Sequence, residues 1–131
     1  MKKLILIFIL SFSTFVYSST SYAAWVEVAK STTGDTFYID FERIRQHSGN
    51  IFYWVLSDYL KPTQLGTVSA VTYYQGDCKL FRYKRLSSHF YEVPMASGQP
   101  ESINNNPADN WSYANPNSAS EIFLNMLCSQ M

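Results

Sequence analysis

The stretch Ile51-Phe52-Tyr53-Trp54-Val55-Leu56-Ser57-Asp58-Tyr59 is the strongest β-strand signal in the chain. Successive side chains of a strand point to opposite faces of the sheet. Both faces are therefore apolar: one carries Phe52, Trp54 and Leu56, and the other carries Ile51, Tyr53 and Val55. This pattern indicates a central strand that is covered on two sides. The alternative is that one face stays exposed and is used for binding or for dimerisation.

Shorter runs on both sides of this stretch also have the composition of strands. They are β-branched and aromatic, and they lie at residues 25–29, 36–40, 68–74, 79–85 and 90–93. Residues 30–35 and 47–50 are typical of turns, and residues 75–77 of a turn or a bulge. Residues 41–45 could form one helical turn. Residues 95–110 hold Gly, Pro and Asn without an apolar period, which predicts an exposed loop.

The last segment changes to a helical period. Ser118 and Glu121 have the Ser-x-x-Glu spacing of a capping box, which predicts a helix N-terminus. The apolar stripe expected on one face consists of Ala119, Ile122, Phe123 and Met126, with Leu127 at its edge. At about 100° per residue, Cys128 points nearly opposite this stripe. We therefore expect the helix to fray near Leu127.

The order of these elements predicts the fold class. Five or six strands followed by one helix are typical of an α+β fold, in which a C-terminal helix packs on one face of an antiparallel β-sheet. Residues 24–131 are sufficient for a single domain and too few for two. No repeat or internal linker interrupts them.

The first residues are typical of a secretory signal peptide. Met1-Lys2-Lys3 is basic, residues 4–16 are almost wholly apolar, and a stretch of small residues ending at Ala23 follows. The apolar run is shorter than the roughly 20 residues that a membrane-spanning helix needs. We predict a signal peptide at residues 1–23, export to the periplasm, cell surface or medium, and no transmembrane segment in the mature chain.

The two cysteines, Cys78 and Cys128, predict one structural disulfide. An even cysteine count in an exported protein favours a bridge, and two cysteines allow one intramolecular pairing. A redox site would need the Cys-x-x-Cys spacing, and a zinc site would need more Cys or His at short spacing. Neither pattern occurs, so we expect no metal site and no cofactor.

Motifs of common enzymes are missing from the sequence. It contains neither the Gly-x-Ser-x-Gly elbow of α/β-hydrolases nor a glycine-rich phosphate loop. Asp35, Asp40, Glu42 and Asp58 could supply an acid–base pair, but their places at turns and strand ends favour structural roles. The formal net charge is zero, and loss of Lys2 and Lys3 with the leader makes it slightly negative. We therefore expect no catalytic residue and no nucleic-acid binding.

The best local signal for partner binding is Lys79-Leu80-Phe81-Arg82-Tyr83-Lys84-Arg85. Cations interleaved with aromatic residues suit acidic or mixed partners through charge and cation–π contacts. The partner-binding candidates are Lys79, Arg82, Lys84 and Arg85. In a strand, Arg82 and Lys84 would face one way and Lys79 and Arg85 the other. The run could therefore equally be a solvated sheet edge guarded by cations.

Several of these features follow one another in a definite order along the chain. They are a strand led by Trp25, then Gly34 to Asp40, Tyr53 to Tyr59, and Val71 to Cys78 with the basic run beyond it, then Trp111 and Pro116-Asn117-Ser118 before a helix that carries Cys128. In this spacing of Trp, Asp and Cys the chain resembles the surface-adhesin protein E family of Gram-negative bacteria. The resemblance covers nearly the whole mature chain.

The resemblance implies an antiparallel sheet whose concave side holds the helix, tied by a Cys78–Cys128 bridge. It also implies an exported, non-enzymatic protein that binds host extracellular-matrix proteins such as vitronectin and laminin, with the four basic candidates matching the family's vitronectin-binding stretch. The alternative is a soluble periplasmic protein that binds a ligand, or forms a homodimer, through its sheet. Two observations favour it: the leader offers no cysteine to acylate, and residues 68–77 contain no Lys or Arg.

Overall fold

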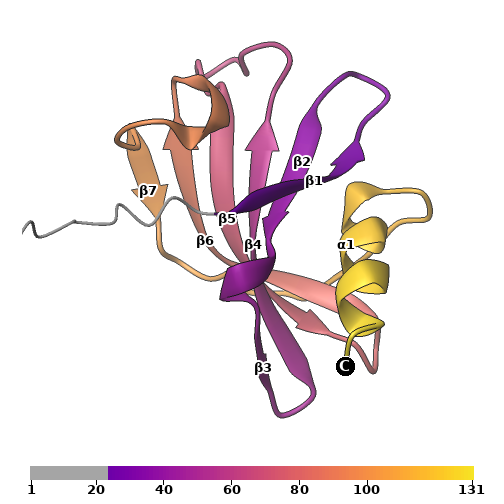
Figure 1. The fold of residues 1–131 in the computed structure, drawn as a ribbon. Coiled ribbons are helices and arrows are strands. Elements are labelled where there is room, and N and C mark those ends of the chain that lie inside the picture. The colour runs from indigo at the N-terminus through magenta and orange to yellow at the C-terminus, as the bar shows by residue number, and fades with distance from the viewer. Residues whose placement is uncertain (1–23) are drawn as a thin grey trace, which may run out of the picture.

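The strongest predicted strand forms β4 (Asn50–Asp58), which lies inside an antiparallel sheet (Figure 1). The structure is a computed structural model, and it describes residues 24–131. Six strands follow one another across the sheet in the order β1 (Trp25–Lys30), β2 (Thr36–Asp40), β4, β5 (Ser69–Asp77), β6 (Arg82–Tyr91) and β7 (Ser102–Asn104). Each of these pairings is antiparallel, so the predicted sheet is confirmed.

Shorter elements complete the fold. The 3-10 turns η1 (Phe41–Arg43) and η2 (Pro94–Ala96) follow β2 and β6, and the helix α1 (Ala119–Cys128) comes last. Two short strands lie off the main path: β3 (Arg45–His47) pairs with β4, and β8 (Ser112–Tyr113) pairs with β6. The described sheet therefore has eight strands instead of five or six. The additional strands are two or three residues long and carry little apolar sequence, so neither length nor periodicity announces them.

The basic run around residue 80 differs from its prediction. A strand was expected over residues 79–85, but residues 78–81 form a turn and β6 begins at Arg82. The Asp77 carboxylate accepts hydrogen bonds from the backbone N–H groups of Lys79 and Leu80, which closes the chain into this turn. Phe81 has a positive φ of 52°, which also interrupts the strand. The expected break at residues 75–77 is wrong, because β5 continues to Asp77.

The helix begins as predicted and buries Phe123 and Leu127 of the predicted stripe, but it buries Leu124 in place of Ile122. Ser118 caps it by accepting the Glu121 N–H, whereas the buried residues are Phe123, Leu124 and Leu127. Ile122, which was expected in the stripe, is 38% exposed. Cys128 follows Leu124 by four residues and therefore lies near the same face. The helix runs through Cys128 without the expected fraying, and the predicted bridge forms from it to Cys78 with Cα atoms 5.6 Å apart.

Gly76 in β5 lets the helix approach the sheet closely. A Cβ atom at Gly76 would lie 2.9 Å from Cδ2 of Leu124 and 3.0 Å from Cγ2 of Ile51. Around this contact lies the main core, which consists of Ile39, Ile51, Tyr53, Val55, Phe123 and Leu127. The Phe37 and Phe123 rings add an edge-to-face contact at 6.0 Å. One face of the sheet is therefore occupied by α1.

The predicted signal peptide, residues 1–23, lies outside the described residues. The boundaries of the single domain, residues 24 and 131, stay a prediction. Within the described part of the chain, the helices are too short or too polar to cross a membrane.

We predict that Gly76→Ala destabilises the protein. Where a strand has room for a Cβ atom, replacing glycine by alanine stabilises the fold by about 0.5–1 kcal/mol. A loss of stability in Gly76→Ala would therefore by itself indicate a steric conflict. Here the new methyl group would overpack against Leu124, and we expect a loss of about 1–3 kcal/mol in the free energy of unfolding. Urea unfolding measures it. The double variant Gly76→Ala/Leu124→Ala should lose less than the sum of the two single variants. Additive losses would contradict the contact.

The disulfide gives a second prediction. Its two cysteines are 50 residues apart in sequence. A loop of this length lowers the entropy of the unfolded chain, so Cys78→Ala/Cys128→Ala should lose up to about 4 kcal/mol of stability. The variant in oxidising buffer should unfold at the same urea concentration as the reduced wild-type protein. If the wild-type protein keeps its full stability after its thiols are shown to be reduced, the bridge does not stabilise the fold.

Candidate functional site

The face of the sheet opposite α1, which we call the open face, combines both options that the sequence allowed for β4. Leu56 is fully buried there, packed with Val71 and Tyr91. Phe52 and Trp54, on the same side of β4, are only half-buried. One end of this face is thus covered and the other is accessible to a partner.

Aromatic rings line the accessible part of the open face. Trp54 lies directly across from Tyr73 in the β4–β5 pairing, and their rings stack with centroids 4.6 Å apart. The Phe52 ring lies 6.2 Å from Tyr73 on one side, and the His89 ring lies 6.1 Å from Trp54 on the other. Such rings offer a large contact area with little conformational freedom to lose on binding.

Arg43 covers one end of this aromatic row. Its Cζ lies 5.6 Å from the Trp25 ring centroid and 5.2 Å from the Trp54 ring centroid, both within cation–π range. Its Nε donates to the Asp40 carboxylate at 2.6 Å. Asp40 is only 1% exposed and also accepts the Glu42 N–H, which caps the turn η1 and agrees with the structural role expected of this residue.

A second cation–aromatic cluster lies at the other end of the open face. Cζ of Arg82 is 4.4 Å from the Trp111 ring centroid, and Nζ of Lys84 is 5.8 Å from it. Arg82 Nε donates to Asp77 at 3.0 Å. The two clusters are built alike, since in each an aspartate holds the arginine Nε and a tryptophan ring lies beside the guanidinium.

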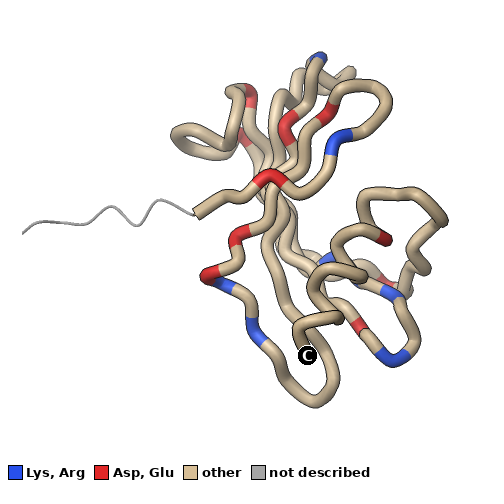
Figure 2. Tube along the Cα trace, turned by 45° about the vertical axis from the view of Figure 1, so that its right-hand side comes forward, with Lys and Arg blue, Asp and Glu red and all other residues tan. Residues whose placement is uncertain are grey.

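The structure separates the four predicted partner-binding residues. Arg82 and Lys84 lie together on the open face, as strand alternation predicts. Arg85 lies across from Tyr74 on the helix side of β6, and its Nη1 donates to the Asn106 carbonyl oxygen at 3.2 Å. Lys79 is exposed in the turn. Figure 2 shows Lys and Arg interspersed with Asp and Glu along the described chain.

Electrostatics fix the position of Arg82. Burial alone would raise the pKa of Asp77, but the Leu80 N–H and the Arg82 guanidinium outweigh it and hold this pKa below its usual range. Asp77 therefore stays ionised at neutral pH. It keeps both the turn and the adjacent arginine in place.

Two tyrosines on the helix side are held neutral. Burial, reinforced by Tyr74 and Tyr83, raises the pKa of Tyr53 far above its usual value. Burial, with Tyr83 nearby, raises the pKa of Tyr74 to about 12. The two rings stack with centroids 5.6 Å apart, so these side chains contribute packing and not proton transfer.

Two of the other candidate carboxylates, Asp35 and Asp58, bind backbone N–H groups. Asp35 accepts the Leu60 N–H at 3.0 Å, and Asp58 accepts the Met95 N–H at 2.8 Å. Both contacts join turns to the ends of strands, which agrees with the structural interpretation of these residues. Over residues 24–131, no group of three or more His, Cys, Asp and Glu side chains is placed to hold a metal ion.

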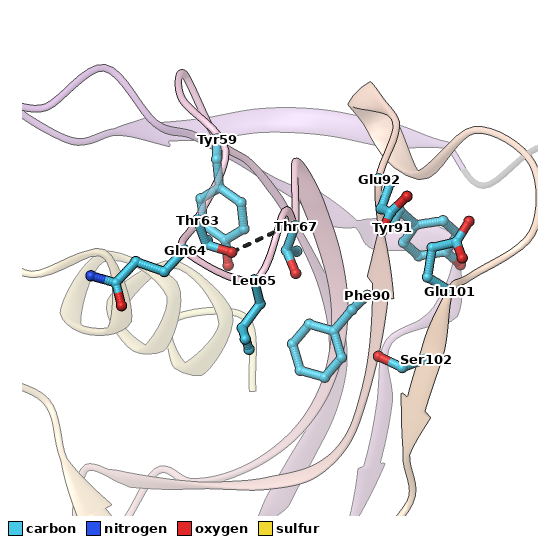
Figure 3. A pocket seen from close by; sticks show the side chains of 10 residues that line it. All are labelled: Tyr59, Thr63, Gln64, Leu65, Thr67, Phe90, Tyr91, Glu92, Glu101 and Ser102. Atoms are coloured by element: carbon cyan, nitrogen blue, oxygen red, sulfur yellow. Dashed lines mark hydrogen bonds between the residues drawn. The ribbon is translucent and has the colours of Figure 1, made fainter.

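Two hollows open near the sheet. One, of about 640 Å³, lies between Trp25, Arg43, Trp54 and the segment 95–98. The other, of about 760 Å³, lies under the loop between β4 and β5 (Figure 3). In Figure 3, Leu65 and Phe90 form its apolar part, and Glu92 and Glu101 lie farther along the same hollow. The first hollow is cationic and the second is acidic.

Comparison with known proteins assigns the chain to a family. The sequence profile of the family described as surface-adhesin protein E matches residues 25–129. The chain belongs to the surface-adhesin protein E family. This membership supports an adhesin-like binding protein. A comparison with curated protein sequences finds no match.

Solved structures of Haemophilus influenzae protein E share the fold. One has a TM-score of 0.61 at 13% identity, with 83% of this chain and 86% of that chain covered. A second crystal form has a TM-score of 0.59 at 14% identity, with 83% and 90% covered. A structure from a non-typeable strain has a TM-score of 0.54 at 14% identity, with 82% and 77% covered. At these identities the likeness shows a common architecture alone.

Sequence reasoning missed the cluster around Arg43. Trp25, Arg43 and Trp54 are far apart in the chain, and they meet because β2 lies between β1 and β4. The available signal was the apolar Phe52–Trp54 side of the central strand, for which an exposed binding face was one option. No comparable signal pointed to Trp111, which lies next to a two-residue strand.

We predict that Asp77→Asn makes stability less dependent on acid pH. Because the folded-state pKa is lowered, ionised Asp77 stabilises the protein above its unfolded-state pKa, and this stabilisation is lost as pH falls through the folded-state value. The variant should be less stable at pH 7 by on the order of 1 kcal/mol, and the difference should shrink below about pH 4. Urea unfolding at several pH values measures it. A gap that stays constant into acid would contradict the role of the charge.

Proposed function

We propose that this protein is exported through its predicted signal peptide and binds host extracellular-matrix proteins at the cell surface. The single observation that carries the proposal is the cluster of Arg82, Lys84 and Trp111 on the open face. Family membership supports the adhesin class of function. The matrix partners, with vitronectin and laminin as the first candidates, are our inference.

The composition of this cluster suits partner binding. Arginine and tryptophan are the side chains that most often dominate binding energy at protein interfaces. Arg82 is already oriented by Asp77, at 3.0 Å, so little side-chain freedom is lost when a partner binds. Lys84 adds a second cation beside the same ring. An acidic segment of a partner that also carries apolar side chains would meet both kinds of contact.

A second candidate function is ligand binding or dimerisation in the periplasm. The hollow at Arg43 favours ligand binding, because it combines an oriented cation with aromatic walls. Cell fractionation and protease treatment of intact cells discriminate the two functions. Digestion by external protease supports the surface protein, whereas protection in the periplasm rules out adhesion.

We predict that the open-face cations carry most of the binding to immobilised vitronectin or laminin. Arg82→Gln/Lys84→Gln should weaken binding by about tenfold or more, because a charge-assisted pair is lost at the centre of the contact. The matched control is Lys79→Gln/Arg85→Gln, which removes the same charge from the turn and the helix side. It should change binding by less than about threefold, the contribution of rim charges.

Circular dichroism of both variants verifies that the fold is intact. Replacing all four residues, Lys79, Arg82, Lys84 and Arg85, should weaken binding no less than the open-face pair does. Raising the salt concentration should weaken binding of the wild-type protein to vitronectin or laminin more than it weakens binding of either pair variant. Equal binding by the wild-type protein and the fourfold variant would show that this cluster does not bind the matrix proteins.

A further inference from the structure

The hollow at Arg43 presents an arginine that is fixed before any ligand arrives. Asp40 holds Nε at 2.6 Å, and the Trp25 and Trp54 rings flank the guanidinium. The side chain is nevertheless 45% exposed. An exposed arginine normally samples many rotamers, and here three contacts restrict it.

Most of the hydrogen-bonding capacity of Arg43 is unused. A guanidinium has five N–H donors, and the contact with Asp40 occupies the one on Nε. Among the described residues, 24–131, its two Nη groups form no hydrogen bond. Two parallel donors of this kind match the two oxygens of a carboxylate.

Another part of the lining of the hollow is a strained segment of backbone. Met95 and Ala96 both have positive φ, at 58° and 51°, which is unfavourable for residues other than glycine. Hydrogen bonds hold them there: Met95 N–H donates to Asp58, and Ala96 N–H donates to the buried Ser69 hydroxyl at 2.9 Å. Strain that is held in place in this way is characteristic of binding sites. The wall is therefore a built feature and does not depend on a ligand to form.

The lining restricts the chemistry of the ligand. The hollow measures about 640 Å³, within the size of known small-ligand sites. Tryptophan, tyrosine, valine and methionine side chains form most of its walls, and none of the described lining residues is acidic. Asp40, which is behind Arg43, is already neutralised by it. We propose that this hollow binds a carboxylate that is carried on an apolar or aromatic group. This inference is independent of the matrix-binding proposal, which rests on the cluster at Trp111.

The test is a titration followed by ¹⁵N–¹H NMR of protein purified after export. The probes are phenylacetate and its uncharged counterpart phenylacetamide. Phenylacetate should shift the indole N–H signals of Trp25 and Trp54 and leave that of Trp111 unchanged. Phenylacetamide should bind about tenfold more weakly or not at all, since it lacks the charge. Equal binding of both probes, or shifts at Trp111 instead, would overturn the proposal.

Arg43→Lys tests the arginine itself. A lysine can keep the ion pair with Asp40, but it loses the paired donors, so phenylacetate should bind about tenfold more weakly. Lys61→Gln is the matched control, because it removes an exposed cation that does not line the hollow, and its affinity should equal that of the wild-type protein. The spectrum away from the hollow verifies the fold of each variant. Wild-type affinity in Arg43→Lys would overturn the proposal.

Two sources could supply such a carboxylate, a free organic acid or the end of a polypeptide. The tripeptide Gly-Gly-Phe and its C-terminal amide extend the titration. Tighter binding of the tripeptide than of phenylacetate assigns the site to a chain end, and tighter binding of phenylacetate assigns it to a free acid. Binding of neither carboxylate overturns the proposal.

Discussion

The close contact between Leu124 of α1 and Gly76 of β5 is the constraint on which the rest of the structure depends. A Cβ atom at residue 76 would lie 2.9 Å from Cδ2 of Leu124, so the leucine or the helix would have to shift to admit it. The helix is therefore held in one position on the sheet, and the bridge at Cys128 fixes its C-terminal end. With one face occupied, any large partner must approach the other face, or the edges.

The open face, where a large partner would bind, carries the same arrangement of side chains at two places. Arg43 is held by Asp40 between Trp25 and Trp54, and Arg82 is held by Asp77 beside Trp111. In both clusters the carboxylate takes the Nε side of the guanidinium, and the ring supports its plane. The outer edge stays free for another molecule. A near-neutral protein can thus present strong local recognition sites without a large positive field.

Much of the architecture follows from local sequence. The alternation around Trp54, the capping residue Ser118 and the cysteine pair led to the sheet, the helix start and the bridge, all of which the structure confirms. The helix face was correct for Ala119, Phe123 and Leu127 and wrong for Ile122, because Leu124 is buried in its place. The Arg43 cluster could not be predicted, since it depends on strand order, which periodicity does not encode.

The position of Cys128 in the chain also constrains when the protein can finish folding. The bridge joins Cys78, in the turn between β5 and β6, to a helix that is synthesised after every strand. It can form only once residue 128 has emerged, and only where thiols are oxidised. In a reducing solution the link is absent, and packing against the sheet alone holds the helix. The same covalent bond that secures the finished molecule is thus missing for as long as the chain is still being synthesised.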